Sequence, residues 1–204
     1  MKKAILILVC FTFISSIQLL AQLSDYKSHE GQLGITYSTF GKSDLGYSTP
    51  VMNDIGFDSK KYYTLGLIYI YKLNERFDLE TGVEYLTSKI TITSVIPNST
   101  PTSETLSLAN IPLTLRVKFL KYCFVNGGLG LNINLSKNNS VDDQTGLGYF
   151  LGLGLKYDFK LGLSLFVNPY MCDHSLIPFA PKKYHQILSD NGLRFGLTFR
   201  LPAS

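Results

Sequence analysis

The sequence predicts an all-β fold: an eight-stranded antiparallel up-and-down transmembrane β-barrel. Three observations lead to this prediction. Apolar and polar residues alternate through a series of segments, and the connections between these segments alternate between long and short. After the N-terminal stretch, no segment offers the roughly 18 continuous apolar residues that a transmembrane helix needs.

The clearest alternating segment runs from Leu147 to Phe159. Leucine, tyrosine and phenylalanine occupy its odd positions, and mostly glycine, lysine and aspartate occupy its even positions. Successive side chains on a strand point to opposite faces, so this pattern predicts a strand about 20 Å or more in length with one apolar face. Such a strand fits a wall between lipid and a polar lumen.

Eight strands follow from the same alternation, taken in chain order. They cover about Gln32–Phe40, Tyr62–Lys72, Phe77–Thr93, Leu106–Phe119, Tyr122–Ser136, Gly146–Phe159, Leu161–Cys172 and Asn191–Leu201. The odd-numbered apolar residues are predicted to face outward. At the end of the third strand the apolar residues move to Ile90 and Ile92, which predicts either a bulge or a projection beyond the bilayer.

The connections support a membrane barrel. Long polar loops are predicted at Gly41–Lys60, Ser94–Thr105, Lys137–Thr145 and Asp173–Gln186, and tight turns at Leu73–Arg76, Leu120–Lys121 and Lys160. Short inner turns and longer outer loops are typical of transmembrane barrels. An even number of strands places both chain ends at the inner rim.

The N-terminus is typical of a secretory signal peptide. Lys2 and Lys3 precede an apolar stretch, and Ala21 offers a small residue for cleavage. We therefore expect a signal peptide over residues 1–21 and a single barrel domain over residues 22–204. The alternative is an uncleaved membrane anchor, which polar interruptions such as Thr12 and Gln18 disfavour.

Net charge and cysteines narrow the possible functions. The formal net charge of +4 is too weak and too dispersed to indicate nucleic-acid binding. Cys123 and Cys172 are predicted at opposite barrel ends and on opposite faces, beyond the reach of a disulfide. We expect two unpaired cysteines that act as small hydrophobic residues.

The inward positions collect charged residues, which we expect to form a structural network that fills the lumen. Its members are Glu80, Glu84, Arg116, Lys118, Lys156, Asp158, Arg194 and Arg200. An eight-stranded barrel has room only for side chains, and buried charges must be paired or hydrated. An ion path or a paired-carboxylate active site is the alternative. Glu80 and Glu84 lie about 13 Å apart along a strand, too far for paired acid and base chemistry.

Two glycine-rich stretches invite comparison with nucleotide-binding loops. Gly127–Gly130 and Gly152–Gly154 resemble fragments of a dinucleotide fingerprint, but strand alternation continues through both and no helix follows. Glycine is expected there because inward positions are crowded. The three histidines lack metal-ligand spacing. We therefore expect no cofactor and no metal.

One group of residues suggests catalysis. Asp173, His174 and Ser175 lie near His185 in the sequence, which raises the alternative of a lipid-modifying enzyme with a site at the outer rim. Adjacent strand residues point to opposite faces, so His174 and Ser175 are poorly placed for a Ser–His hydrogen bond. We expect the protein not to be an enzyme.

A further alternative is a soluble, lipocalin-like barrel. It predicts apolar residues inside the barrel and Arg116, Arg194 and Arg200 outside.

A family resemblance supports the membrane assignment. The segment Asn110-Ile111-Pro112-Leu113-Thr114-Leu115-Arg116, followed by Phe124-Val125-Asn126-Gly127-Gly128-Leu129-Gly130, resembles the porT-like outer-membrane β-barrel family of Bacteroidota. Leu20-Ala21-Gln22 is similar to signal-cleavage sites of those bacteria. The resemblance implies an eight-stranded barrel of the OmpA/OmpX-like architecture and carries over no catalytic residue. The chain departs from many outer-membrane proteins by ending in Pro202-Ala203-Ser204 rather than in an aromatic residue.

The expected function follows from the scaffold. We expect a small barrel in the outer membrane of a Gram-negative bacterium that acts as a structural or interaction protein through four outward loops. The expected partners are outer-membrane lipid and an envelope or secretion-system protein.

Overall fold

The structure is a computed structural model, and it describes residues 31–47, 55–94, 102–136, 141–180 and 184–201. The expected signal peptide lies outside the described residues. The described part of the chain contains no helix long and apolar enough to cross a membrane.

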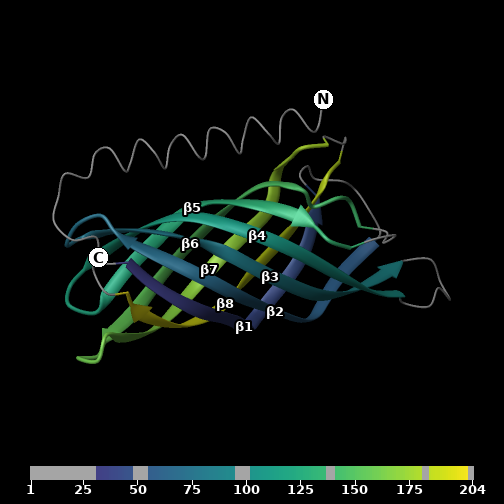
Figure 1. The fold of residues 1–204 in the computed structure, drawn as a ribbon. Coiled ribbons are helices and arrows are strands. Elements are labelled where there is room, and N and C mark those ends of the chain that lie inside the picture. Colours follow the sequence, from purple (N-terminus) through teal and green to yellow (C-terminus); the bar gives the residue numbers. More distant parts are fainter. Residues whose placement is uncertain (1–30, 48–54, 95–101, 137–140, 181–183, 202–204) are drawn as a thin grey trace. The chain divides into compact units, whose positions relative to one another are not determined.

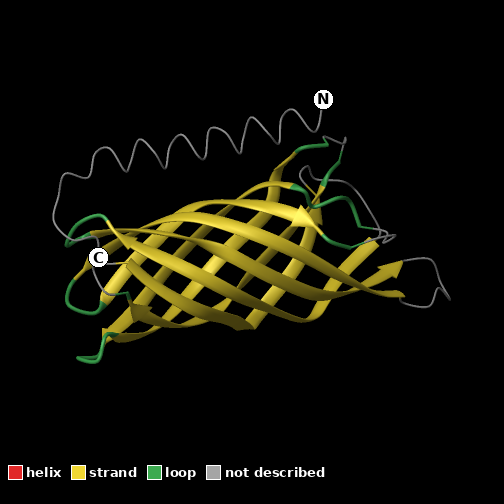
Figure 2. Ribbon diagram, viewed as in Figure 1, coloured by secondary structure: helices red, strands yellow, loops and turns green. Residues whose placement is uncertain are grey.

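Eight antiparallel strands close into one barrel (Figures 1 and 2). The strands are β1 Gly31–Tyr47, β2 Ile55–Lys72, β3 Phe77–Ser94, β4 Thr102–Phe119, β5 Cys123–Asn134, β6 Gly146–Asp158, β7 Leu163–Pro178 and β8 Gln186–Arg200. Each strand pairs with its neighbours in sequence, and β1 pairs with β8, from Gln32↔Arg200 to Tyr47↔Gln186. The predicted fold class is confirmed.

Alternate residues along each strand form the outer and the inner face of the barrel wall. On β6, Leu151, Leu153 and Leu155 are about half exposed on the outside, and Gly152 and Gly154 are buried. The outward apolar residues lie between two levels of aromatic residues. Tyr122 stacks on Tyr157 near the inner end, with ring centroids 5.8 Å apart, and Tyr63 and Tyr85 are exposed toward the outer end. We call the wall between these two levels the membrane band, since aromatic girdles flank the apolar band of such barrels.

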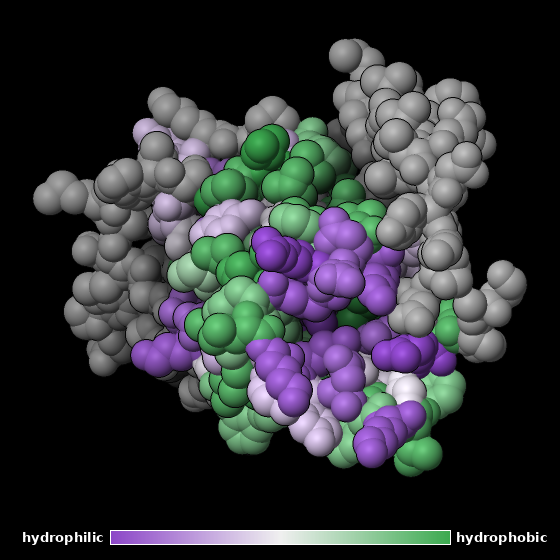
Figure 3. All heavy atoms as spheres, turned by 90° about the vertical axis from the view of Figure 1, so that its left-hand side faces the viewer, coloured by the Kyte–Doolittle hydropathy of each residue, from purple (hydrophilic) through white to green (hydrophobic). Residues whose placement is uncertain are grey.

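The inner turns are short and locally determined. The Asn74 side chain accepts hydrogen bonds from the backbone N–H groups of Arg76 and Phe77, both at 2.8 Å. Gly162 has φ +83°, a conformation that glycine adopts without steric cost, and it lies in the turn between β6 and β7. Figure 3 views the barrel from the end that carries the short inner turns, on the left in Figure 1. Hydrophilic side chains gather in the middle of this face, and hydrophobic ones lie around them.

Strands β1, β2, β4, β7 and β8 extend further at the outer end than predicted, whereas β5 ends earlier, at Asn134 rather than Ser136. Much of the predicted loops Gly41–Lys60, Ser94–Thr105 and Asp173–Gln186 is paired strand. The prediction ended each strand where its outward apolar residues stopped. Pairing depends on backbone hydrogen bonds, however, and these continue where the outward residues become polar.

A bulge explains part of this error on β1. The register between β1 and β8 shifts between Thr39 and Lys42, and Phe40 in between has φ +58°. After the bulge the alternation changes phase, so that the odd residues Ser43 and Leu45 are buried. The sequence pattern breaks here although the strand does not.

Of the two forms predicted for the end of β3, the bulge is absent from its pairing with β4, and the strand instead continues outward beyond Tyr85. Its register with β4 runs without interruption from Glu84↔Asn110 to Ile92↔Thr102. Ile90 is buried and stays in phase with Glu84. The phase of the strand is therefore unchanged. The inward side chains change from polar, at Glu84, to apolar, at Ile90. The irregularity lies on the facing strand, between Ser59 and Lys61 of β2.

The two segments that carry the family resemblance lie opposite each other on β4 and β5. Pro112 pairs with Gly130, and Thr114 pairs with Gly128. A Cβ atom on Gly128 would lie 2.1 Å from the carbonyl oxygen of Leu113, so only glycine allows this close approach of the two strands. Cys123 and Cys172 are both free, as expected. Cys172 lies within β7 rather than at its end.

Candidate functional site

The lumen within the membrane band is the candidate site, and a buried ion-pair network occupies its centre. Arg116 pairs with Glu80, and Arg194 Nη1 lies 2.6 Å from Glu80 Oε1. Arg194 Nη2 also lies 3.1 Å from Glu84 Oε1. Asn110 donates to Glu84 Oε2 at 2.9 Å. Two arginines and two glutamates thus balance their charges in a water-excluded interior.

The strand register brings these residues together. Asp78 of β3 pairs with Arg116 of β4, and Glu80 pairs with Thr114, so Glu80 and Arg116 are diagonal neighbours on one inward face. Arg194 approaches from β8, across the lumen. The network therefore connects strands that lie far apart in the sequence.

Aromatic rings complete this cross-section. The guanidinium carbon of Arg116 lies 4.1 Å from the ring centroid of Phe124 and 4.7 Å from that of Phe166. The two rings pack edge to face, 6.0 Å apart, together with Ile68 and Ile70. Nε and Nη1 of Arg116 have no hydrogen-bond partner among the described residues. Cation–π contacts replace part of the solvation that this guanidinium loses. These aromatic partners were not predicted, although Phe124 and Phe166 lie at inward positions of the alternating pattern.

A second group of charges lies near the inner rim. Lys118 Nζ lies 2.8 Å from Asp78 Oδ1, and Lys156 Nζ lies 3.0 Å from Asp158 Oδ1. Arg200 is exposed at the end of β8, where its charge acts on Asp158 of this group. The eight candidate residues are therefore divided. Four form the buried network, and the other four, Arg200 included, lie near the inner rim.

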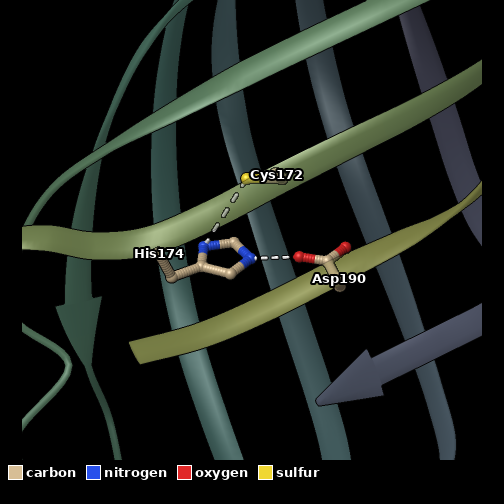
Figure 4. Close-up of side chains that lie close together, drawn as sticks. All are labelled: Cys172, His174 and Asp190. Atoms are coloured by element: carbon tan, nitrogen blue, oxygen red, sulfur yellow. Dashed lines mark hydrogen bonds and ion pairs between the residues drawn. The ribbon is translucent and has the colours of Figure 1, made fainter. Parts of the chain in front are cut away.

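A polar cluster around His174 lies further toward the outer end (Figure 4). His174 Nε2 lies 2.5 Å from Asp190 Oδ1, and its Nδ1 lies 2.7 Å from Asn132 Oδ1. Tyr170 donates to Asp190 Oδ2 at 2.6 Å. Cys172 Sγ lies 4.0 Å from His174 Nδ1. The cluster links β5, β7 and β8 through side chains that are all buried.

The thiol, imidazole and carboxylate of this cluster are close enough to hold a metal ion, within 4.8 Å of one another. Both imidazole nitrogens already have partners, however, and the adjacent cavity is only about 10 Å³. This is about the space of one water molecule. The cluster is best explained as a satisfied buried hydrogen-bond network.

The predicted rim site does not assemble as one unit. Ser175 has φ +53°, so it and His174 are both buried, and the prediction of opposite faces is wrong at this pair. The reason is local, because the left-handed backbone conformation interrupts the strand alternation. Ser175 Oγ lies 3.4 Å from His185 Nε2, whereas His174 is bonded to Asp190. Asp173 has intermediate exposure and is not part of either contact.

Beyond the membrane band, the lumen is filled by apolar side chains. We call this group the outer plug, and it consists of Leu45, Leu86, Ile90, Leu106, Leu108, Val141 and Leu188. The segment 141–145 closes over it. Gln144 is fully buried, donates to the carbonyl oxygen of Gln186 at 2.7 Å and accepts from the N–H of Leu188 at 3.1 Å. The lumen is therefore occupied by side chains both within the band and above it.

Comparison with known proteins agrees with this architecture. A family model described as "Outer membrane protein beta-barrel domain" matches residues 7–168. No curated protein matches the chain. Among solved structures, the outer membrane protein OprG from Pseudomonas aeruginosa is similar with a TM-score of 0.51 and 11% identity, over 87% of this chain and 98% of that one. The outer membrane protein AlkL, solved in lipid bilayers, is similar with a TM-score of 0.50 and 15% identity, over 89% of this chain and 94% of that one. At these identities the likeness shows the fold alone.

Proposed function

The chain belongs to the outer membrane protein β-barrel domain family, and from this premise we propose that it is a closed barrel that acts as a structural or interaction protein. The filled lumen is the observation that carries the proposal. Arg116 between Phe124 and Phe166 occupies the cross-section within the band, and the outer plug occupies the mouth. A barrel filled in this way offers solutes no water-filled path.

The binding surface proposed is the part of the strands beyond the membrane band. Strands β3 and β4 remain paired out to Ile92↔Thr102, and Ser103 and Thr105 are exposed there. Strands hold surface residues in fixed positions, which favours recognition by a partner. The partner proposed is another envelope protein, such as a component of a secretion system. We propose no catalytic role, because Ser175, His185 and His174 belong to two separate contacts.

Two finer assignments are part of the same proposal. We propose porT-like membership within the family, supported by the direct pairing of Pro112 with Gly130 between the two resembling segments. We also propose export through a signal peptide cleaved after Ala21. N-terminal sequencing of the protein purified from outer membranes tests the cleavage site, and an N-terminus other than Gln22 would contradict it.

Planar-bilayer recording of the purified barrel tests closure. The expected result is no steady conductance above that of the bare bilayer. Stable, large-conductance openings would show a channel and overturn the closed-barrel proposal.

Site-specific photo-crosslinking in native outer membranes tests the interaction role. A photoreactive residue at Thr105, beyond the band, should give a defined protein adduct, and one at Lys160, in an inner turn, should not give the same adduct. Identical adducts at both positions would indicate non-specific contacts. The lack of any adduct at Thr105 and at other exposed outer positions would count against an interaction role.

A further inference from the structure

Two lysines lie directly opposite each other on the outer wall. Lys61 of β2 pairs with Lys89 of β3, and both side chains are exposed. Like charges directly opposite on a sheet destabilise it. An anion bound between the two lysines would relieve this repulsion.

The described neighbours of this pair do not neutralise it. Lys89 also pairs with Thr105 of β4, and the next outward pair toward the membrane is Tyr63 with Thr87. Glu104 lies opposite Ile90, which belongs to the inward-facing set. Among the described side chains, the outward neighbours thus offer hydroxyl groups and no carboxylate.

Lys42 provides a contrast at the same end of the barrel. It is exposed on β1, and Asp44 is exposed two positions further along the same strand. Residues two apart share one face of a strand. Lys42 therefore has an acidic neighbour on its own face, which the Lys61–Lys89 pair lacks.

The lysine pair lies at the outer boundary of the membrane band. On the same two strands, Tyr63 and Tyr85 are 40% and 42% exposed, and Leu65 and Val83 below them are 52% and 57% exposed. Tyrosine rings favour the level of lipid headgroups. The tight inner turns lie at the opposite end, so this boundary belongs to the outer leaflet.

The order of side chains along these strands matches one class of ligand. From the membrane outward the cross-strand pairs are Leu67–Val83, Leu65–Tyr85, Tyr63–Thr87 and Lys61–Lys89, so one tyrosine lies on each of the two levels between the apolar pair and the lysines. The Tyr85 hydroxyl donates to Ser107 Oγ at 3.1 Å, which orients its ring along the wall. We propose that this stripe binds a phosphorylated glycolipid of the outer leaflet. Its acyl chains lie on Leu65 and Val83, its sugar lies on the tyrosine rings, and Lys61 and Lys89 bind its phosphate through charge-assisted hydrogen bonds.

Native mass spectrometry of the full-length folded barrel, with defined glycolipids added, tests this proposal. The probes are bisphosphorylated lipid A and the same lipid after removal of its phosphates. The test variant is Lys61→Gln/Lys89→Gln. The control variant is Lys121→Gln/Lys160→Gln, which loses the same charge from exposed positions at the inner turns.

The expected result is that the test variant binds the phosphorylated lipid at least about tenfold more weakly, because it loses two charge-assisted hydrogen bonds and one alone accounts for about tenfold, while the control variant is unchanged. The dephosphorylated lipid should bind the unmodified barrel as weakly as the phosphorylated lipid binds the test variant. Equal weakening in both variants, or no preference for the phosphorylated lipid, would overturn the proposal. Full displacement of the lipid by inorganic phosphate alone would show simple anion binding and would also overturn it.

Stability gives a second, independent readout. Without phosphorylated lipid, the test variant should be at least as resistant to urea as the unmodified barrel, because the repulsion between two cations is gone. With the lipid present, the order should reverse, because only the unmodified barrel gains stability from binding. The same order under both conditions would contradict a phosphate between the lysines.

Discussion

Two levels of the lumen carry opposite chemistry on the inward faces of the same strands. Within the membrane band, β3 and β4 turn Glu80, Glu84 and Arg116 inward. Further out, the same strands turn Leu86, Ile90, Leu106 and Leu108 inward. The outward faces change in the opposite direction, from Leu65 and Val83 to Lys61 and Lys89.

This difference shows that the medium around the barrel, lipid or water, determines which residues face outward and which face the lumen. Lipid requires an apolar outer face, and the narrow lumen behind it can hold charges if they are paired. Beyond the aromatic level the barrel is surrounded by water, so an apolar interior becomes favourable, as in a soluble barrel. The lipocalin-like alternative is wrong, because it placed Arg116 and Arg194 outside and both are buried in the lumen. Only the apolar interior at the outer end resembles that of a soluble barrel.

Removing Arg116 should have the largest effect, because it breaks the charge balance inside the band. Arg116→Met leaves Glu80 and Glu84 with one arginine and should destabilise the barrel by about 3–5 kcal/mol. Urea unfolding of the barrel in a defined bilayer measures this.

The double variant Arg116→Met/Glu80→Gln should recover part of the loss, because Arg194 and Glu84 then remain as a balanced pair. Lys118→Met, two positions away on β4, serves as the control. Lys118 is 28% exposed but its partner Asp78 only 4%, so removing Lys118 leaves a buried carboxylate and should cost about 1–3 kcal/mol, less than the loss of Arg116. Equal losses for Arg116→Met and Lys118→Met would show that the central network has no special role.

Placing the same cation on the outer face at two levels compares lipid with water directly. Leu153→Arg, on the lipid-facing side of β6, should cost about 2–4 kcal/mol, and Thr105→Arg, beyond the aromatic level, about 0–1 kcal/mol. Leu153 is 56% exposed and Thr105 is also exposed, so neither substitution creates a cavity. The same unfolding measurement applies. Equal costs at the two positions would show that the boundary assigned to the membrane band is wrong.

The cover of the outer plug depends on Gln144. Replacing Gln144 with leucine keeps most of the volume but leaves the N–H of Leu188 and the carbonyl oxygen of Gln186 without this partner. The expected loss is about 1–3 kcal/mol, together with faster proteolysis within residues 141–145. Lys160→Gln, in an exposed inner turn, should change stability by less than about 0.5 kcal/mol. Unchanged proteolysis would show that segment 141–145 does not depend on this side chain.

The smallest effect expected tests the phase of β3. Ile90→Val should cost about 0.5–1.5 kcal/mol because Ile90 is packed within the outer plug. Ile35→Val, at a position 59% exposed toward lipid, should change stability by less than about 0.5 kcal/mol. If Ile90 faced outward, as a change of phase requires, the two substitutions would have similar effects in thermal unfolding.

The sequence by itself determined the strand number, the order and the two faces of the wall within the band. These features follow from a local rule, since alternate side chains point to opposite sides and lipid demands apolar ones. The inward positions of Glu80, Arg116 and Arg194 followed from the same rule. So did the short inner turns, where Asn74 and Gly162 provide the local chemistry.

Only the tertiary structure decided the strand ends, the pairing inside the lumen and the buried histidines. Strand ends were missed because backbone pairing persists after the amphipathic pattern fades, and because Phe40 and Ser175 adopt positive φ without being glycine. The partners of Arg116 come from β3, β5 and β7, and register and barrel closure alone fix which of them meet. Side chains that meet across a lumen have no fixed spacing in sequence, so no pattern along the chain reports their contact.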